Sequence, residues 1–151
     1  MSVAFRRESD EEHKEPRFEL PIPPGPNYVT ARGLALIAAR VGELEAKIAA
    51  AEGAEREVIA RDLRYWHTRQ VTAILAPLPP ADEVAFGSRV RVRVGTAERV
   101  LELVGDDEAD PANGRIPISA PLARALVGTA EGDLLGFGPG VEVLEILEHE
   151  A

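Results

Sequence analysis

The spacing of apolar residues changes once along this chain, and the change divides it into two regions of different construction. From residue 34 to residue 48, apolar side chains recur at alternating intervals of three and four, the spacing of one helix packed on another. From residue 84 the interval is two, as in strands with one buried face. Pro77, Pro79 and Pro80 separate the two patterns. We therefore expect an α+β protein in which an N-terminal antiparallel helical hairpin precedes a small antiparallel sheet domain with one short helix.

The first pattern predicts a short coiled coil of two helices. Thr30 is a suitable N-cap for the first helix, and Gly53 is expected at the turn. The apolar seam of the first helix is expected to consist of Leu34, Ile37, Val41, Leu44 and Ile48. The second helix is expected from about residue 55 to Leu75, and the residues facing the first helix are expected to be Ile59, Leu63, Trp66 and Ile74. Each helix then has about 20 residues and a length of about 30 Å.

The second pattern predicts a sheet of short strands. Strands are expected at 90–94, 100–104, 116–118, 134–137 and 141–147. A short helix is expected to begin at Pro121, since proline is favoured at the first helical position, and to end near Gly128.

Four segments follow from these patterns. They are an extended or disordered tail at 1–27, the helical hairpin at 28–76, a Pro-rich linker at 77–83 and the sheet domain at 84–149. The tail is charged at first and then carries five prolines between Pro16 and Pro26, which exclude a helix there.

Composition excludes several classes of function. The 151 residues include no cysteine and three histidines, so we expect no metal and no cofactor. No apolar run is long enough to cross a bilayer and no secretory signal is recognisable, so we expect a cytoplasmic protein without membrane contact. The net charge of −9 argues against direct, sequence-specific contact with nucleic acid.

Three groups of side chains could have a function, but for each of them we expect a structural role. One strand face carries Arg89, Arg91 and Arg93, which could contact phosphate but are expected to form ion pairs with neighbouring strands. An acidic loop contains Asp106, Asp107, Glu108 and Asp110. It could bind calcium, but it lacks the spacing of an EF-hand, so we expect a solvated turn. The third group is an aromatic cluster on the second helix, Tyr65, Trp66 and His67. It could anchor a partner, but we expect it to pack at the junction of hairpin and sheet domain, and we expect no catalytic role for His67.

Several motifs, in order, resemble the C-terminal domain of the bacterial GreA/GreB transcription elongation factors. They are Phe86-Gly87-Ser88, Val104-Gly105-Asp106-Asp107-Glu108-Ala109-Asp110, Gly114-Arg115-Ile116, Pro121-Leu122-Ala123-Arg124-Ala125-Leu126-Val127-Gly128 and Gly132-Asp133. Tyr28-Val29-Thr30 with Gly33-Leu34 also resembles the start of the family's first helix.

The resemblance implies an FKBP-like fold for the sheet domain and binding of that domain to RNA polymerase at the mouth of the secondary channel. The positions that match the family's polymerase contact are Ser119, Pro121, Leu122 and Arg124. Ala120 stands where the family usually has a capping serine, and Ser119 could replace that cap from one residue away.

The chain departs from the family at the hairpin tip. In the family, a long coiled coil carries an acidic tip that helps to hold a catalytic magnesium ion in the polymerase. That tip motif is absent here, the arm is shorter, and the acids near the turn are Glu52, Glu55 and Glu57. Short-armed relatives of the Rnk type, which bind polymerase without rescuing it, are the closer comparison.

The leading hypothesis is a non-enzymatic regulator that binds RNA polymerase and acts at the secondary channel without transcript cleavage. One alternative is a cleavage-stimulating elongation factor with Glu52 and Glu55 at the tip. Another is a protein-interaction or dimerisation module unrelated to polymerase. Prolyl isomerase activity is not expected, because Phe86 and Phe137 are the only aromatic residues of the sheet domain.

Overall fold

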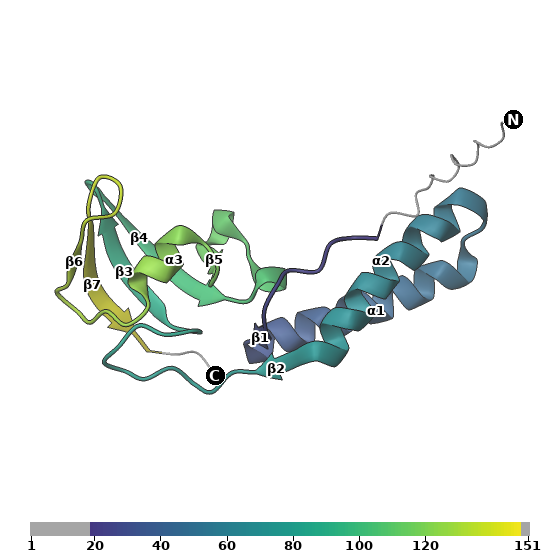
Figure 1. Cartoon of the computed structure of the whole chain (residues 1–151), viewed down its shortest axis with the longest axis horizontal. Helices are drawn as coiled ribbons and strands as arrows, with labels where there is room; N and C mark the ends of the chain where they lie inside the picture. Colours follow the sequence, from purple (N-terminus) through teal and green to yellow (C-terminus); the bar gives the residue numbers. More distant parts are fainter. Residues whose placement is uncertain (1–18, 149–151) are drawn as a thin grey trace, which may run out of the picture. The chain divides into compact units, whose positions relative to one another are not determined.

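The computed structural model describes residues 19–148, in which a pair of helices precedes a sheet (Figure 1). The chain divides into two compact units. One comprises Ile37–Thr72 with the described residues up to Gly25, and the other comprises Pro26–Leu36 with the chain from Ala73 onward. Most of the predicted tail, residues 1–18, lies outside the described residues, as does the last predicted residue of the sheet domain, residue 149.

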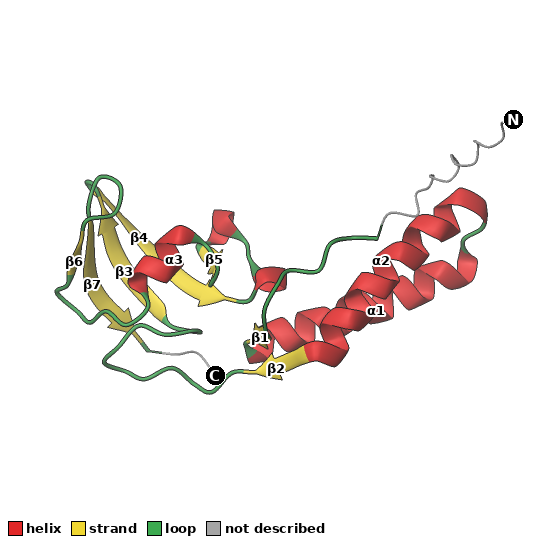
Figure 2. Cartoon of the chain, in the orientation of Figure 1, coloured by secondary structure: helices red, strands yellow, loops and turns green. Residues whose placement is uncertain are grey.

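The two predicted helices are confirmed, and both are short. Helix α1 spans Ala31–Ala50 and helix α2 spans Gly53–Thr72, with 20 residues each, which corresponds to about 30 Å (Figure 2). Gly53 has a φ of +62°, a conformation that glycine adopts at little cost, and this explains why the turn lies there. Among residues 19–148, no helix is both long and apolar enough to span a membrane.

The apolar seam of the hairpin is narrower than the heptad spacing predicts. Ile37, Val41 and Leu44 are buried as expected, but Leu34 is 37% exposed and Ile48 is only half-buried. Helix α2 contributes few large apolar side chains to cover the seam, and those predicted to face α1 within the helix are half-buried: Ile59, Leu63 and Trp66.

The end of the second helix differs from the prediction. Helix α2 stops at Thr72, and residues Ala73–Leu75 form strand β2, which pairs in parallel with strand β1, Asn27–Val29. The β-branched residues at the end of α2 disfavour helix, and Ala76 N donates to Val29 O at 3.0 Å, which extends the pairing. The prediction that Ile74 belongs to the helix and faces α1 is therefore wrong: Ile74 is the strand neighbour of Tyr28 and is 46% exposed.

The sheet domain contains five strands in the order β5-β4-β3-β7-β6. Their bounds are β3 Arg89–Val94, β4 Ala97–Val104, β5 Arg115–Pro117, β6 Leu134–Leu135 and β7 Val141–Leu147. All five predicted strands are present, but the expectation of a purely antiparallel sheet is wrong. Strand β5 runs parallel to β4, because two 3₁₀ turns, η2 (Asp106–Glu108) and η3 (Pro111–Asn113), carry the chain across before β5 begins.

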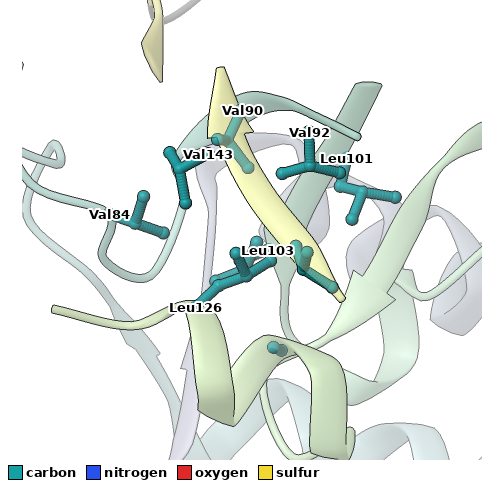
Figure 3. Close-up of a cluster of buried hydrophobic side chains, with 9 residues drawn as sticks. Val84, Val90, Val92, Leu101, Leu103, Leu126 and Val143 are labelled. Atoms are coloured by element: carbon teal, nitrogen blue, oxygen red, sulfur yellow. The ribbon is translucent and has the colours of Figure 1, made fainter. Parts of the chain in front are cut away.

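The predicted short helix, α3 (Pro121–Leu126), contributes to the core of this domain. Alternate residues of the strands point inward and meet Leu126 of α3 (Figure 3). The buried cluster comprises Val84, Val90, Val92, Leu101, Leu103, Ala123, Leu126, Val141 and Val143. Burial of each large aliphatic side chain contributes about 1.5–3 kcal/mol, so α3 is held firmly by the sheet domain.

Candidate functional site

The first turn of α3 carries the positions predicted to contact a partner. Ser119, Pro121 and Arg124 are exposed, whereas Leu122 is half-buried and packs against the core. Leu122 therefore anchors the turn, and the other three side chains are available to a partner. Val127, which the sequence did not single out, is 45% exposed and continues the three-residue spacing of Pro121 and Arg124. We call Ser119, Pro121, Arg124 and Val127 the α3 surface.

Ser119 does not take over the missing helix cap. Ala120 is the N-cap residue and makes no side-chain cap hydrogen bond, while Pro121 occupies the first turn, where its missing N–H costs nothing. The Ser119 hydroxyl instead donates to Asp106 Oδ1 at 3.0 Å. Ser119 thus links the α3 surface to the acidic loop.

The acidic loop is not the solvated turn that its composition predicts. Glu108 is 5% exposed and accepts hydrogen bonds from Thr30 Oγ1 at 2.5 Å and from Arg32 Nε at 2.6 Å. Thr30 and Arg32, which supply these donors, precede Glu108 by 78 and 76 positions, so no local pattern of the sequence indicates the contacts. The prediction of a solvated turn is therefore wrong for Glu108, because the first turn of α1 covers it.

Two glycines allow this close approach. A Cβ on Gly33 would lie 2.8 Å from Glu108 Oε1, and a Cβ on Gly105 would lie 2.5 Å from the carbonyl oxygen of Tyr28. A side chain at Gly105 would push the loop away from the backbone of Tyr28, and a side chain at Gly33 would displace the Glu108 carboxylate. We call Thr30, Arg32, Gly33, Gly105 and Glu108 the root cluster.

Arg32 extends the root cluster to the sheet. Its Nη2 atom lies 2.5 Å from Glu102 Oε2, in addition to the contact with Glu108. Burial lowers the pKa of Arg32, but hydrogen bonds and charge from Glu102 and Glu108 outweigh that effect and leave the pKa of Arg32 above its ordinary value. The two carboxylates thus favour the charged form of the guanidinium that joins them.

The hairpin tip has a different character. Ala51 and Glu52 connect the two helices, and Glu52 and Glu55 are both exposed. A cation lies at the same place, since Arg56 Nη1 donates to the carbonyl oxygen of Ile48 at 2.5 Å and caps the end of α1. Within residues 19–148, no group of three or more His, Asp or Glu side chains is arranged to hold a metal ion.

Two of the three arginines of β3, Arg91 and Arg93, form the ion pairs predicted for them, and among residues 19–148 Arg89 forms none. Arg91 contacts Glu98 at 3.1 Å and Glu145 at 3.0 Å, and Arg93 contacts Glu142 at 2.6 Å. A hydrogen bond with Glu145, followed by one with Glu98, raises the pKa of Arg91. Arg91 and Arg93 are therefore both paired with glutamates of neighbouring strands.

The aromatic pair of α2 packs within the hairpin. Tyr65 and Trp66 meet edge to face with ring centroids 5.2 Å apart, and the Arg40 guanidinium of α1 lies 5.5 Å from the Trp66 ring centroid. His67 Nε2 lies 3.3 Å from Glu45 Oε2, an exposed contact between the helices. This cluster therefore joins the two helices to each other.

Comparison with known proteins finds a family to which part of this chain is similar. The model of the C-terminal domain of transcription elongation factors GreA/GreB matches residues 79–148. Transcription elongation factor GreA of Pseudomonas aeruginosa is 38% identical over 117 residues, which are 75% of this chain and 62% of that protein. An alignment of this length does not fit within the sheet domain, so the similarity includes part of the hairpin.

Other relatives cover less of the chain. Transcription elongation factor GreA of Chelativorans sp. is 43% identical over 72 residues, 43% of this chain and 46% of that protein. The chain thus spans less than two thirds of the length of these relatives.

Two solved structures are also similar. GreA factor homolog 1 of Thermus thermophilus aligns with a TM-score of 0.40 at 14% identity, over 82% of this chain and 100% of that chain. A GreA/GreB factor of Nitrosomonas europaea aligns with a TM-score of 0.41 at 22% identity, over 81% of this chain and 99% of that chain. Residues 79–148 of this chain match the C-terminal domain of the GreA/GreB transcription elongation factors, and the similarity to GreA extends into the hairpin.

Proposed function

We propose that this protein binds bacterial RNA polymerase through the α3 surface and regulates transcription elongation at the secondary channel without stimulating transcript cleavage. In this proposal it is not an enzyme and needs no cofactor. The observation that carries the proposal is the α3 surface itself. Three of the four positions that match the family's polymerase contact are exposed on one rigid turn, and Leu122 fixes that turn to the core.

The size of the hairpin supports a role without cleavage. A helix of 20 residues extends about 30 Å, and any ligand at its end can act only on a metal ion within that reach. Glu52 and Glu55 are exposed beside Arg56, whose positive charge offsets part of theirs. A short arm with such a tip fits obstruction of the channel better than delivery of a magnesium ligand.

The burial of the seam bears on the dimerisation alternative. Ile37, Val41 and Leu44 are covered within the chain itself, so these three seam residues are not available to a second copy. Sedimentation at several protein concentrations tests this alternative, and we expect a monomer throughout. A concentration-dependent dimer lost on substitution of Leu34, the exposed seam residue, would favour a dimerisation module instead.

The proposal is tested by titrating the protein against purified core RNA polymerase. We expect saturable binding that the Arg124→Glu and Pro121→Ala variant weakens at least tenfold, because charge and shape of the α3 surface both change. Arg99→Glu is the matched control, since Arg99 is an exposed arginine of β4 and not a member of the α3 surface, and it should bind like the unmodified protein. No binding of the unmodified protein, or equal binding of all three proteins, would refute the proposed surface.

A further inference from the structure

We propose that residues 3–7 of this chain dock in an apolar hollow at the tip of its own hairpin. The inference goes beyond the proposed function and does not depend on it, because it concerns the free protein. The described residues that carry it all belong to one compact unit, which comprises Ile37–Thr72 and the chain up to Gly25.

The hollow lies at the connection between α1 and α2 (Figure 2). It has a volume of about 590 Å³, within the usual range of ligand pockets. Its lining includes two charged residues and is otherwise apolar: Lys47 and Glu55, with Ala50, Ala51, Val58 and Ile59. An apolar segment with charged neighbours therefore matches this lining.

The hairpin itself covers the apolar side chains of the hollow only in part. Val58 is 50% exposed, and Ile59 is half-buried. Covering such side chains with another apolar group removes their surface from water, which is favourable. The hollow is therefore a place where a further apolar segment would be stabilised.

The described chain brings the N-terminal tail close to the hollow. Arg64 of α2 donates to both carboxylate oxygens of Glu19 at 2.8 Å, so residue 19 is held beside this helix. Arg64 follows Val58 by six positions, which corresponds to about 9 Å along the helix. The residues that precede Glu19 therefore start near the hollow.

The sequence of the tail indicates which part of it fits. Residues 6–17 contain no aliphatic or aromatic hydrophobic residue. Just before them, Val3, Ala4 and Phe5 form a short apolar run. This run is the part of the tail that can cover apolar side chains and is far enough from Glu19 to move independently of it.

The intervening chain is long enough for this contact. Phe5 precedes Glu19 by 14 positions, and a flexible chain of that length spans about 20 Å on average. That span exceeds the separation of Arg64 from Val58 along α2. A segment tethered in this way has an effective concentration on the order of millimolar, so weak contacts suffice to hold it.

Charges on the two sides are complementary. Residues 6–7, which directly follow the apolar run, are both arginine. Glu55 lines the hollow and Glu52 lies beside it in the turn, and both are exposed. Lys47, the cation of the lining, already pairs with Glu43 at 3.6 Å. A docked segment therefore brings its two cations close to acids, which favours this occupant.

Paramagnetic NMR on the full chain tests the inference. Because the chain has no cysteine, Ser2→Cys provides a unique site for a nitroxide label next to the segment. Docking holds this label near the hollow, where it broadens the signals of neighbouring amides. We expect the Ile59 amide to lose at least half of its intensity. The amide of Val71, about 18 Å further along α2, should lose at least three times less.

Two pairs of matched variants separate docking from mere proximity of the tail. Phe5→Ser changes the segment and Val58→Ser changes the hollow, and each should reduce the intensity loss at Ile59 at least twofold. Phe18→Ser and Val71→Ser replace the same residue types elsewhere on the tail and on α2, and should leave the loss unchanged. Circular dichroism establishes that each variant is folded. An undiminished loss in either Phe5→Ser or Val58→Ser would overturn the inference, as would an equal reduction in the two controls.

A mixed sample decides whose segment occupies the hollow. Protein that carries the nitroxide but no isotope label is combined with isotope-labelled protein that carries no nitroxide. We expect no intensity loss at Ile59 in this mixture, because the chain's own segment outcompetes that of a second copy through its tether. A loss as large as that within a single chain would assign the hollow to a second copy and overturn the inference.

Discussion

Glutamates from other segments lie at both ends of helix α1, and the surroundings of these glutamates differ completely. At the start of the helix, Glu108 is 5% exposed and both of its oxygens are bound. At the other end, Glu52 and Glu55 are exposed to solvent near the turn. The comparison teaches that the environment of a carboxylate, not the number of acids in a segment, determines what it does. The acid that composition assigns to a solvated loop is structural, and the acids at the tip are free to interact with solvent.

Energetic estimates separate the two ends in the same way. A hydrogen bond to a charged group contributes about 1.5–3 kcal/mol when it is shielded from water. An acid in the exposed first turn of a helix contributes about 0.3–1 kcal/mol through the helix dipole. Substitutions in the root cluster should therefore have much larger effects on stability than substitutions at the tip.

The largest effect is expected at Gly105. A methyl group there would lie 2.5 Å from the backbone carbonyl oxygen of Tyr28, which cannot move as a side-chain end can. We expect Gly105→Ala to lower the free energy of unfolding by about 3 kcal/mol, measured by urea denaturation. Gly136→Ala, where the new methyl group meets nothing within 4 Å, is the control and should change stability by less than about 0.5 kcal/mol. Equal stability of the two variants would show that the loop does not pack on the start of α1.

The next largest effect is expected at Glu108. Glu108→Gln places an amide group opposite the donors of Thr30 and Arg32 and removes the charge that pairs with Arg32. We expect a loss of about 2 kcal/mol in the free energy of unfolding. Glu98→Gln removes the same charge from an exposed ion pair with Arg91 and should cost less than about 1 kcal/mol. A Glu108→Gln variant no less stable than Glu98→Gln would contradict the burial of the root cluster.

A smaller effect of opposite sign is expected within α1. Gly42→Ala should stabilise the protein by up to about 1 kcal/mol, because alanine loses less backbone entropy in a helix and the site is open. Thermal unfolding followed by circular dichroism measures the gain. Gly33→Ala should show no such gain, although the helix propensity changes identically. If both variants gained stability equally, Gly33 would have no packing role.

The smallest effect is expected for an exposed ion pair of the hairpin unit. Arg64 donates to both carboxylate oxygens of Glu19 at 2.8 Å, and this hydrogen bonding lowers the pKa of Glu19. Because the pKa is lowered in the folded protein, the pair contributes its full stabilisation at pH values above the usual pKa of glutamate. This contribution is lost as the pH falls through the lowered pKa. NMR titration should give Glu19 a lower pKa in the parent than in Arg64→Ala. Identical values in both proteins would contradict the pair.

Local features of the fold could be predicted from the sequence, and long-range ones could not. The spacing of Ile37, Val41 and Leu44 and the alternation along β3 report on a residue's own element, so α1 and the strands of the sheet domain are predicted correctly. The end of α2 and the pairing of β1 with β2 are not predicted, because that pairing joins residues far apart in the sequence. Whether β5 runs parallel to β4 depends on the path of the loop between them, which spacing does not record.

The candidate site shows the same limit. The exposed turn of α3 follows from Pro121 and the flanking motif, because it is a local structure. The root cluster joins Thr30 to Glu108 across 78 positions, and nothing near either residue indicates the other. One signal was available. The two family-like motifs, at the start of α1 and in the acidic loop, each contain a glycine, and a Cβ on Gly33 or Gly105 would lie 2.8 Å or 2.5 Å from an atom of the opposite segment.

The most direct test of the proposed function measures binding and transcript cleavage in the same reaction. Backtracked elongation complexes with magnesium are titrated with the protein, and both complex formation and RNA length are followed. We predict saturable binding with no shortening of the transcript beyond that of polymerase alone, because the 20-residue helices end in exposed acids beside Arg56. Shortening that requires the protein and is lost in the Glu52→Ala and Glu55→Ala variant would contradict this prediction and identify a cleavage factor.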